Sequence, residues 1–142
     1  MASAAELYQA FYDRVWVNGD IEAIDEFLAK DTSSKGLLTD FSANAQDVKE
    51  LVFAARALLV GIECAIDVSV DADPWYWAHV TITGRDATTM RTISISGQVM
   101  GRMDNGALVE VYNTFDLLSF FESLGSLPEN ATALMLSGTK FN

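Results

Sequence analysis

The hydrophobic pattern of this chain changes near Gly61, and that change limits the fold more than any other feature of the sequence. Before Gly61, apolar residues recur three and four positions apart, which is the spacing of amphipathic helices. From Ile62 to Asp71, apolar and more polar residues alternate, which is the two-residue period of a strand with one solvated face. We therefore expect an α+β fold in which helices come first and close one side of a bent antiparallel sheet.

Capping and stop signals divide the first half of the chain into three helices. Ser3 and Glu6 form a capping-box pattern at the start of the first helix, and Asn18-Gly19 is a natural stop at its end. Asp20 is a suitable N-cap for a second, shorter helix. The helices are expected from about Ser3 to Val17, after Asp20, and after Asn44 or Ser42, with a short strand at Gly36-Leu37-Leu38 before the third.

Turn signals divide the second half into strands. Asp73-Pro74 separates the alternating segment from residues 75–84, which carry aromatic side chains on both faces. Asp104-Asn105-Gly106 is a strong hairpin signal, because Asn and Gly accept the positive φ angles of a tight reversal. The strands on either side of this hairpin are expected at about Thr88–Met103 and Val109–Phe115, followed by helices at about Asp116–Leu124 and before Gly138.

Composition and charge argue against several classes of function. A length of 142 residues suits one domain, predicted over residues 1–142 with a C-terminal extension at 127–142. Acidic residues outnumber basic ones by 20 to 9, so nucleic acid and anionic membrane surfaces are poor partners. With Cys64 as the one cysteine and His79 as the one histidine, neither a disulfide framework nor a metal site is expected. The N-terminus lacks a signal-peptide pattern and no segment suits a membrane span, so we expect a cytoplasmic protein.

Three segments resemble one known family in their order and spacing. They are FYDRVWVNGDIEAIDEFLAKD (11–31), with its Asn-Gly-Asp corner between two helices, VTITGRD (80–86), and MDNGALVEVYNTFDLLSFFESLG (103–125), with its hairpin, last strand and closing helix. The chain resembles the SnoaL-like polyketide cyclases and related ester cyclases of the nuclear-transport-factor-2-like superfamily. The resemblance implies a cone-shaped α+β fold, in which about three N-terminal helices pack on a strongly curved antiparallel sheet, short helices follow, and a pocket lies between the layers.

The resemblance also implies a chemistry. Polyketide cyclases of this family use an Asp of the last strand as general acid and base, removing a proton next to a carbonyl group for an aldol-type ring closure without a cofactor. Asp116 occupies the matching position, Tyr112 stands where the family usually has Trp, and His79 matches a position that tends to be basic. Catalytic roles are therefore expected for these three residues, on a small apolar or aromatic molecule. The residues expected to line the pocket are Tyr12, Trp16, Phe53, Trp77, Arg91, Met100 and Glu110.

The residues themselves leave the role of Asp116 open. Apolar neighbours such as Phe115 should desolvate its carboxyl group, which would raise its pKa toward the range of a general base. An Asp directly before a helix is also a favoured N-cap, and that bonding lowers the pKa of the carboxyl group instead. Shared parity places Glu110 and Tyr112 on one strand face with Asp116. Glu110 can equally be solvent-facing or ion-paired, and His79 can be a hydrogen-bonded core residue.

Two departures from the family pattern favour a second class of function. Lys35 stands where the family commonly has a His on its first strand, and Asn113 stands where relatives are often acidic. A non-catalytic ligand-binding or accessory protein with the same fold is therefore the alternative to a cyclase or isomerase, and both classes stay open. Relatives usually pair through the outer sheet face, so we expect a homodimer. Trp75, Tyr76 and Trp77 can serve that interface or stack on a ligand.

Overall fold

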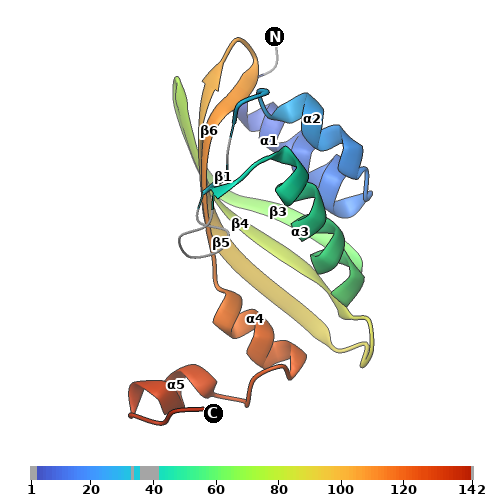
Figure 1. Ribbon diagram of the computed structural model, residues 1–142, viewed down its shortest axis with the longest axis vertical. Helices are drawn as coiled ribbons and strands as arrows, with labels where there is room; N and C mark the ends of the chain where they lie inside the picture. The colour runs from blue at the N-terminus through green and yellow to red at the C-terminus, as the bar shows by residue number, and fades with distance from the viewer. Residues whose placement is uncertain (1–2, 33, 36–41, 142) are drawn as a thin grey trace.

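The computed structural model describes residues 3–32, 34–35 and 42–141, and it shows helices on one face of a curved sheet (Figure 1). Five helical segments come before the long strands, four of them as the consecutive pairs α1–η1 and η2–α2, and two short helices come after the strands. The α+β architecture expected from the sequence is therefore confirmed. The short strand expected at Gly36-Leu37-Leu38 lies outside the described residues.

The first helices start where the capping signals indicate. A complete capping box joins Ser3 and Glu6, and a second one begins at Asn44. Asp20 precedes the second helical segment, but its carboxylate binds Arg14 at 2.9 Å instead of capping the helix. The segments are α1 (Ala4–Phe11), the π-helix η1 (Tyr12–Val17), the 3₁₀-helix η2 (Ile21–Ala23), α2 (Ile24–Phe27) and α3 (Ala45–Leu58).

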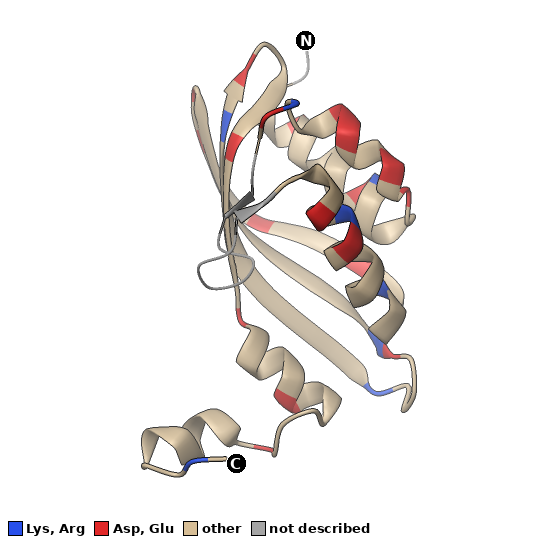
Figure 2. Cartoon of the chain, in the orientation of Figure 1, with Lys and Arg blue, Asp and Glu red and all other residues tan. Residues whose placement is uncertain are grey.

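Acidic side chains lie along the helices, and two cations join them in groups (Figure 2). Lys49 of α3 contacts the carboxylates of Glu22 and Asp25 at 3.1 and 2.8 Å, which ties α3 to the η2–α2 segment. Arg14 contacts Glu26 at 2.6 Å as well as Asp20, which ties η1 to the same segment. Ion pairs at the protein surface contribute little to stability, so these pairs orient the helices more than they stabilise the fold.

Four long antiparallel strands form the sheet, and two very short strands extend it. The spatial order is β2-β1-β6-β5-β4-β3, with β1 parallel to β6. The β5–β6 hairpin turns at Asn105 and Gly106, whose φ angles are 51° and 80°, as the Asp-Asn-Gly signal predicts. The strands are β1 (Ser34–Lys35), β2 (Ser42–Ala43), β3 (Leu59–Ala72), β4 (Trp75–Asp86), β5 (Thr92–Asp104) and β6 (Ala107–Phe115).

The sheet has an inner face toward the helices and an outer face away from them. On β4, Tyr76, Ala78 and Val80 are buried, whereas the residues between them are half-exposed on the opposite face. The ring of Tyr8 in α1 stacks on that of Tyr76, with the ring centroids 4.9 Å apart. The hydrophobic core is the inner face together with the helix residues that cover it.

A β-bulge between β5 and β6 decides which residues of β6 face inward. Arg102 of β5 pairs with Glu110, but the next residue of β5 pairs with Leu108, so Val109 is an extra residue on β6. Leu108 and Val111 are both buried in the core although they are three positions apart. A strict two-residue alternation therefore fails across Val109.

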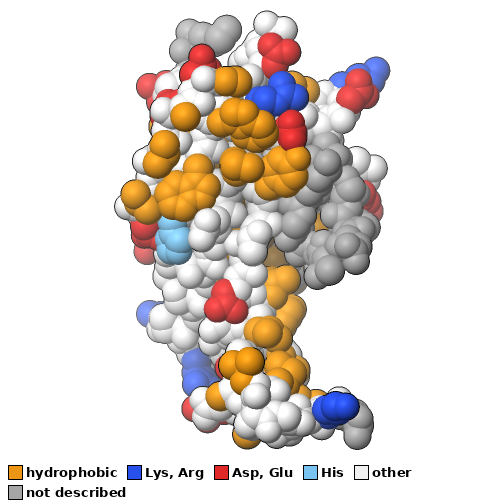
Figure 3. All heavy atoms as spheres, turned by 90° about the vertical axis from the view of Figure 1, so that its left-hand side faces the viewer, with side chains coloured by type: hydrophobic (Ala, Val, Ile, Leu, Met, Phe, Trp, Pro, Cys, Tyr) orange, Lys and Arg blue, Asp and Glu red, His pale blue; other side chains and the backbone are white. Residues whose placement is uncertain are grey.

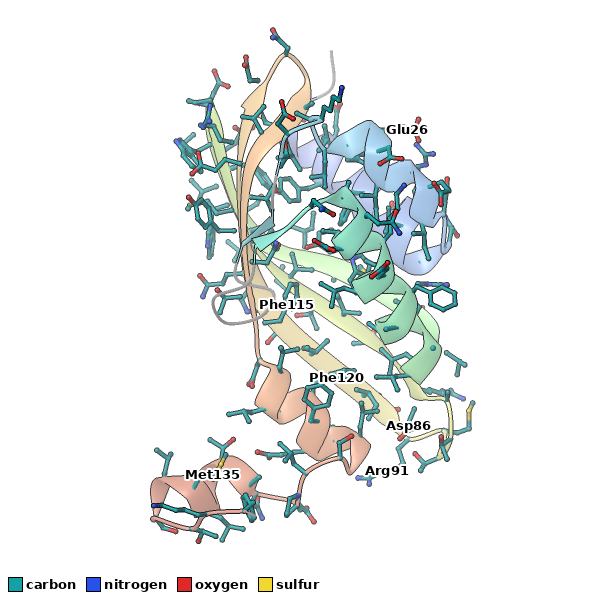
Figure 4. All side chains as sticks on the ribbon, viewed as in Figure 1. Glu26, Asp86, Arg91, Phe115, Phe120 and Met135 are labelled. Carbon is teal, nitrogen blue, oxygen red and sulfur yellow. The ribbon has the colours of Figure 1, made fainter. Side chains whose placement is uncertain are left out.

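β5 begins at Thr92 rather than at Thr88, where the sequence-based prediction put its start. The Asp86 carboxylate accepts hydrogen bonds from the backbone N–H groups of Thr88 and Thr89 at 2.8 and 3.4 Å, which favours a turn over residues 87–91. These bonds hold the pKa of the Asp86 carboxyl group below its usual range. Asp86 and Arg91 consequently lie at the tip of the β4–β5 hairpin (Figure 4).

Two helices follow β6. α4 (Leu117–Leu124) lies beside the sheet, and α5 (Ala131–Leu136) projects away from it (Figure 1). The Glu122 carboxylate accepts hydrogen bonds from the backbone N–H and the hydroxyl of Thr132 at 2.9 and 2.7 Å, which joins the two helices. Across the described parts of the chain, no helix is both long and apolar enough to cross a membrane. The single-domain organisation of residues 1–142 stays a prediction.

We predict that Gly101→Ala lowers the free energy of unfolding by roughly 1–3 kcal/mol, because the new methyl group would overpack the core. A Cβ atom at Gly101 would overlap the Tyr8 hydroxyl and lie 2.7 Å from Leu108 Cδ2. Adding Tyr8→Phe should recover part of the loss, since it removes the overlapping hydroxyl. Tyr8→Phe alone should be neutral or stabilising, because that buried hydroxyl has no hydrogen-bond partner among the described residues. Urea unfolding of the four chains measures these effects, and equal stability of Gly101→Ala and the parent would contradict the overlap.

Candidate functional site

A cavity of about 470 Å³ lies between the helices and the inner face of the sheet. Its walls come from α1, η1, α3, α4 and the inner faces of the strands, and they are almost entirely apolar. Four of the residues that line it carry a polar side-chain group: Tyr8, Tyr12, Trp16 and Asn113. The Tyr8 hydroxyl is itself buried and lies against Gly101. Among the described residues, no Asp, Glu, Lys, Arg or His lines the cavity. A cavity of this composition suits an uncharged apolar molecule held by a few hydrogen bonds.

The π-helix η1 supplies two of the polar side chains, and both were expected in the pocket from the sequence. Tyr12 begins η1 and Trp16 lies one turn later, and the structure brings both to the cavity. Burial raises the pKa of the Tyr12 phenol well above its ordinary value. The hydroxyl therefore stays protonated near neutral pH and is suited to donate a hydrogen bond rather than to act as a base.

β6 and α4 form the opposite end of the cavity. Asn113 and Phe115 line it from the last residues of β6, and Leu117, Phe120 and Phe121 line it from α4. The ring of Phe120 points from α4 toward the sheet (Figure 4). α4 thus contributes only apolar side chains to the cavity wall.

Asp116 lies between these two elements, but its carboxylate does not line the cavity. Asp116 is the N-cap of α4, and its Oδ1 accepts a hydrogen bond from the backbone N–H of Ser119 at 3.0 Å. The residue is exposed. Of the two roles that the sequence left open for Asp116, the structure shows the geometry of the helix cap.

The other two residues expected to be catalytic lie on the outer face of the sheet, so their predicted place in the pocket is wrong. Tyr112 donates a hydrogen bond to Glu110, which raises the pKa of the tyrosine, and Glu110 also accepts one from Arg102 Nε at 3.1 Å. His79 Nδ1 lies 2.9 Å from the carboxylate of Asp67. The shared parity of Glu110 and Tyr112 is correct, but the face they share points away from the helices.

Four further residues expected in the pocket do not line it. Trp77 and Met100 pair with each other across β4 and β5 on the outer face, where the Trp77 indole N–H donates to Gln98 at 3.1 Å. Phe53 is on the solvent side of α3, with 68% of its surface exposed. Arg91 is exposed in the turn before β5, at the far end of the hairpin. The parity of β4 and β5 and the helical face of α3 account for these corrections.

The sequence-based prediction missed Asn113 and the aromatic residues of α4. A signal for Asn113 was present: it shares a two-residue parity with Val111 and Phe115, which are apolar, whereas the opposite parity carries Glu110 and Tyr112. The more apolar face of a strand normally faces the core. Lys35, which stands where the family commonly has a His, pairs through its backbone with Tyr112.

The described residues also offer little for metal binding. No group of three His, Cys, Asp or Glu side chains in these parts of the chain lies close enough together to hold a metal ion. His79, Asp67 and Thr81 form a polar trio on the outer face, where the Thr81 hydroxyl donates to Asp67 at 2.5 Å. That bond, with the one from His79, lowers the pKa of the Asp67 carboxyl group. The trio is therefore satisfied internally.

Comparison with known proteins identifies the fold. No protein-family model matches the chain, and no curated protein matches it in sequence. Among solved structures, a "putative polyketide cyclase" from Acidithiobacillus ferrooxidans is similar at a TM-score of 0.73 and 21% identity, over 88% of this chain and 96% of that one. A "putative SnoaL-like polyketide cyclase" from Jannaschia sp. CCS1 is similar at a TM-score of 0.73 and 11% identity, over 87% and 92%.

A third structure extends the likeness beyond the cyclases. It is a hypothetical protein with a ketosteroid isomerase-like fold from Catenulispora acidiphila in complex with trimethylamine, similar at a TM-score of 0.73 and 12% identity, over 91% of this chain and 98% of that one. At such low identities the likeness shows the fold and not the chemistry. The chain has the SnoaL-like, nuclear-transport-factor-2-like fold, so the resemblance that its sequence predicted is confirmed at that level.

We predict that Asp116→Ala lowers the free energy of unfolding by about 1 kcal/mol, because the N-terminal amides of α4 lose their cap. Asp116→Asn should stay close to the parent, because the Asn side chain caps helices about as well as Asp. Chemical denaturation of the three proteins tests this order. Equal losses in both variants would show that the negative charge, and not the capping bond, is what matters at this position.

Proposed function

We propose that this chain is a cytoplasmic protein that binds a small, uncharged, apolar or aromatic molecule in the cavity between the helices and the inner sheet face. The observation that supports the proposal most is the absence of any charged side chain from the described cavity wall. A volume of about 470 Å³ falls in the range of roughly 300–1,000 Å³ that is common for ligand pockets. A charged ligand would lose its hydration there without gaining a counter-ion from the described residues.

The polar groups in the cavity define how such a ligand would be oriented. Tyr12 and Trp16 line the cavity from η1, and Asn113 lines it from β6. The first two are hydrogen-bond donors, and an Asn amide can both donate and accept. A ligand with a carbonyl or hydroxyl oxygen on an otherwise apolar frame therefore matches this wall best.

Acid/base chemistry on the same ligand is the second candidate function. It is favoured by the fold shared with proteins named as putative polyketide cyclases, and by the Tyr12 hydroxyl, which can hold a developing oxyanion next to a carbonyl carbon. The candidate bases expected from the sequence, Asp116 and His79, are not among the residues that line the cavity. We therefore propose ligand binding first and catalysis second. Chromatography of the ligand after incubation, with mass detection, distinguishes the two. A binding protein returns the ligand at its original retention time, whereas a cyclase or isomerase yields a product that elutes separately even where its mass is unchanged.

We predict that the protein binds N-phenyl-1-naphthylamine at least about tenfold more tightly than 1-anilinonaphthalene-8-sulfonate. The two probes share one ring system, and the second adds a sulfonate whose burial the described wall does not compensate. Fluorescence titration measures both affinities. Equal affinities would contradict a charge-free cavity.

Two alanines of α3 provide a matched pair of variants for the same titration. Ala55 lines the cavity, whereas Ala57 is exposed on the same helix and does not line it. Ala55→Phe should fill the cavity and weaken binding of the neutral probe by about tenfold or more, and Ala57→Phe should leave it unchanged. If both variants bind like the parent, the probe occupies another site.

We propose further that the protein pairs as a homodimer through its outer sheet face. The strand register aligns Val70, Trp77, Met100 and Tyr112 in one row across β3, β4, β5 and β6. Val70 is 53% exposed and Met100 is 37% exposed, and hydrophobic side chains gather on this face (Figure 3). An apolar row of this kind is typical of the centre of a protein interface.

We predict that the parent protein has twice the 15.5 kDa mass of one chain, and that Met100→Glu makes it monomeric. In a two-fold dimer the variant would bring one added carboxylate from each copy near the centre of the interface, where charges are disfavoured. Ser94→Glu is the matched control, because Ser94 is exposed on the same strand and has the same parity as Met100. Light scattering after size exclusion measures the masses. A monomeric parent at micromolar concentration would refute the proposal.

A further inference from the structure

We infer that Arg56 of α3 is a positioning residue for the cavity: it holds the π-helix η1 in the register that points Trp16 toward the ligand. The inference rests on the proposed binding function, and it adds a residue that does not itself line the cavity. Arg56 is only partly buried, and it lies one helical turn after Val52, a residue of α3 that lines the cavity. It therefore connects two walls of the cavity.

The first observation is that α1 changes into a π-helix before it reaches Trp16. The N–H of Asn18 donates to the carbonyl of Asp13 at 3.0 Å, a five-residue interval that marks the wider turn. Four residues complete slightly more than one turn of an α-helix and slightly less than one turn of this wider helix. From Tyr8 to Tyr12, in the α-helix, the side-chain direction therefore moves slightly past one full turn about the helix axis. From Tyr12 to Trp16, in the π-helix, it stops slightly short of one full turn, so the two small rotations oppose each other. All three side chains stay on the side of the cavity.

The second observation is that Arg56 binds the carbonyls at the end of this π-helix. Helix ends leave their last carbonyl groups without intrahelical partners. Arg56 Nε donates to the carbonyl of Trp16 at 2.9 Å, and its Nη2 donates to the carbonyl of Val17 at 3.4 Å. The planar guanidinium group presents its donors in a fixed fork, so the two bonds fix a direction as well as a distance.

The third observation is the space that the chain leaves for the guanidinium group. A Cβ atom at Gly19 would lie 2.5 Å from Arg56 Nη1 and 2.8 Å from Arg56 Cζ. The glycine after η1 therefore lets the side chain of Arg56 lie directly against the backbone. Loss of the two bonds would remove the partners of the Trp16 and Val17 carbonyls, and a return of η1 to the α-helical register would rotate Trp16 away from its place in the wall.

The experiment measures the position of Trp16 and the affinity of the cavity together. In a Trp75→Phe, Trp77→Phe background, Trp16 is the one tryptophan of the chain. Its emission maximum and its energy transfer to bound N-phenyl-1-naphthylamine report its surroundings and its distance from the probe. We compare the background with Arg56→Met, which keeps an apolar stem, and with Arg56→Lys, which keeps one charged donor group.

Arg14→Met is the control, because Arg14 lies on the same π-helix but binds exposed carboxylates of Asp20 and Glu26. Urea unfolding of each variant corrects for stability. For Arg56→Met we expect at least about fivefold weaker probe binding, a shifted Trp16 emission and reduced energy transfer. Arg56→Lys should be intermediate, and Arg14→Met should change neither affinity nor emission even where it lowers stability.

The outcomes separate this inference from the function on which it rests. If the background binds the probe and Arg56→Met binds it equally with unchanged emission, the positioning role is wrong and the binding function stands. If Arg14→Met weakens binding as much as Arg56→Met, the effect is one of helix stability and the inference also falls. If the double Trp→Phe background binds neither N-phenyl-1-naphthylamine nor 1-anilinonaphthalene-8-sulfonate, the proposed binding function fails. A role for Arg56 in that function then fails with it.

Discussion

The structure depends on covering one apolar face of a strongly curved sheet. Each long strand turns its inner side toward the helices, and the contact that anchors the cover is the stack of Tyr8 on Tyr76. From there α1 and η1 follow the sheet, α3 lies beside them and α4 closes the far end (Figure 1). Because the sheet curves while the helices are short and straight, the cover does not fill the concave space. The cavity is the part of this space that remains.

Much of this fold was predictable, because its signals are local. The capping box at Ser3, the change of period near Gly61 and the Asp-Asn-Gly turn each specify a few neighbouring residues, and the structure has all of them. Of the two starts expected for the third helix, Asn44 and Ser42, the structure has Asn44 as the N-cap. The site was less predictable for a physical reason. Alternation shows that Glu110 and Tyr112 share a face, but not which side the helices cover, and the extra residue Val109 shifts the parity of the strand. In β4 the more apolar parity was the better guide to the inner face.

Charged side chains lie mainly on the surface of this chain, whereas the described residues that line its cavity are uncharged. Carboxylates and their partners occupy the outer face and the helix exteriors, where water screens them, and Asp116 satisfies the amides of α4. The polar residues that line the cavity, Tyr8, Tyr12, Trp16 and Asn113, are uncharged instead. In apolar surroundings, neutral donors of this kind hold their protons over a wide pH range. For Tyr12, burial raises the pKa of the phenol. Recognition in the cavity would therefore depend on shape and hydrogen bonding.

β3 has a consequence for how this protein can associate. It is the last strand in the sheet order, and its 14 residues leave one long edge without a neighbouring strand in the described parts of the chain. Such edges invite strands of other molecules to add to the sheet. Two register shifts interrupt β3, and the charged side chains of Glu63, Asp67 and Asp71 lie along it. An irregular backbone and repeated negative charges disfavour the addition of a strand from another molecule to this edge. Both features therefore disfavour fibril-like growth through β3.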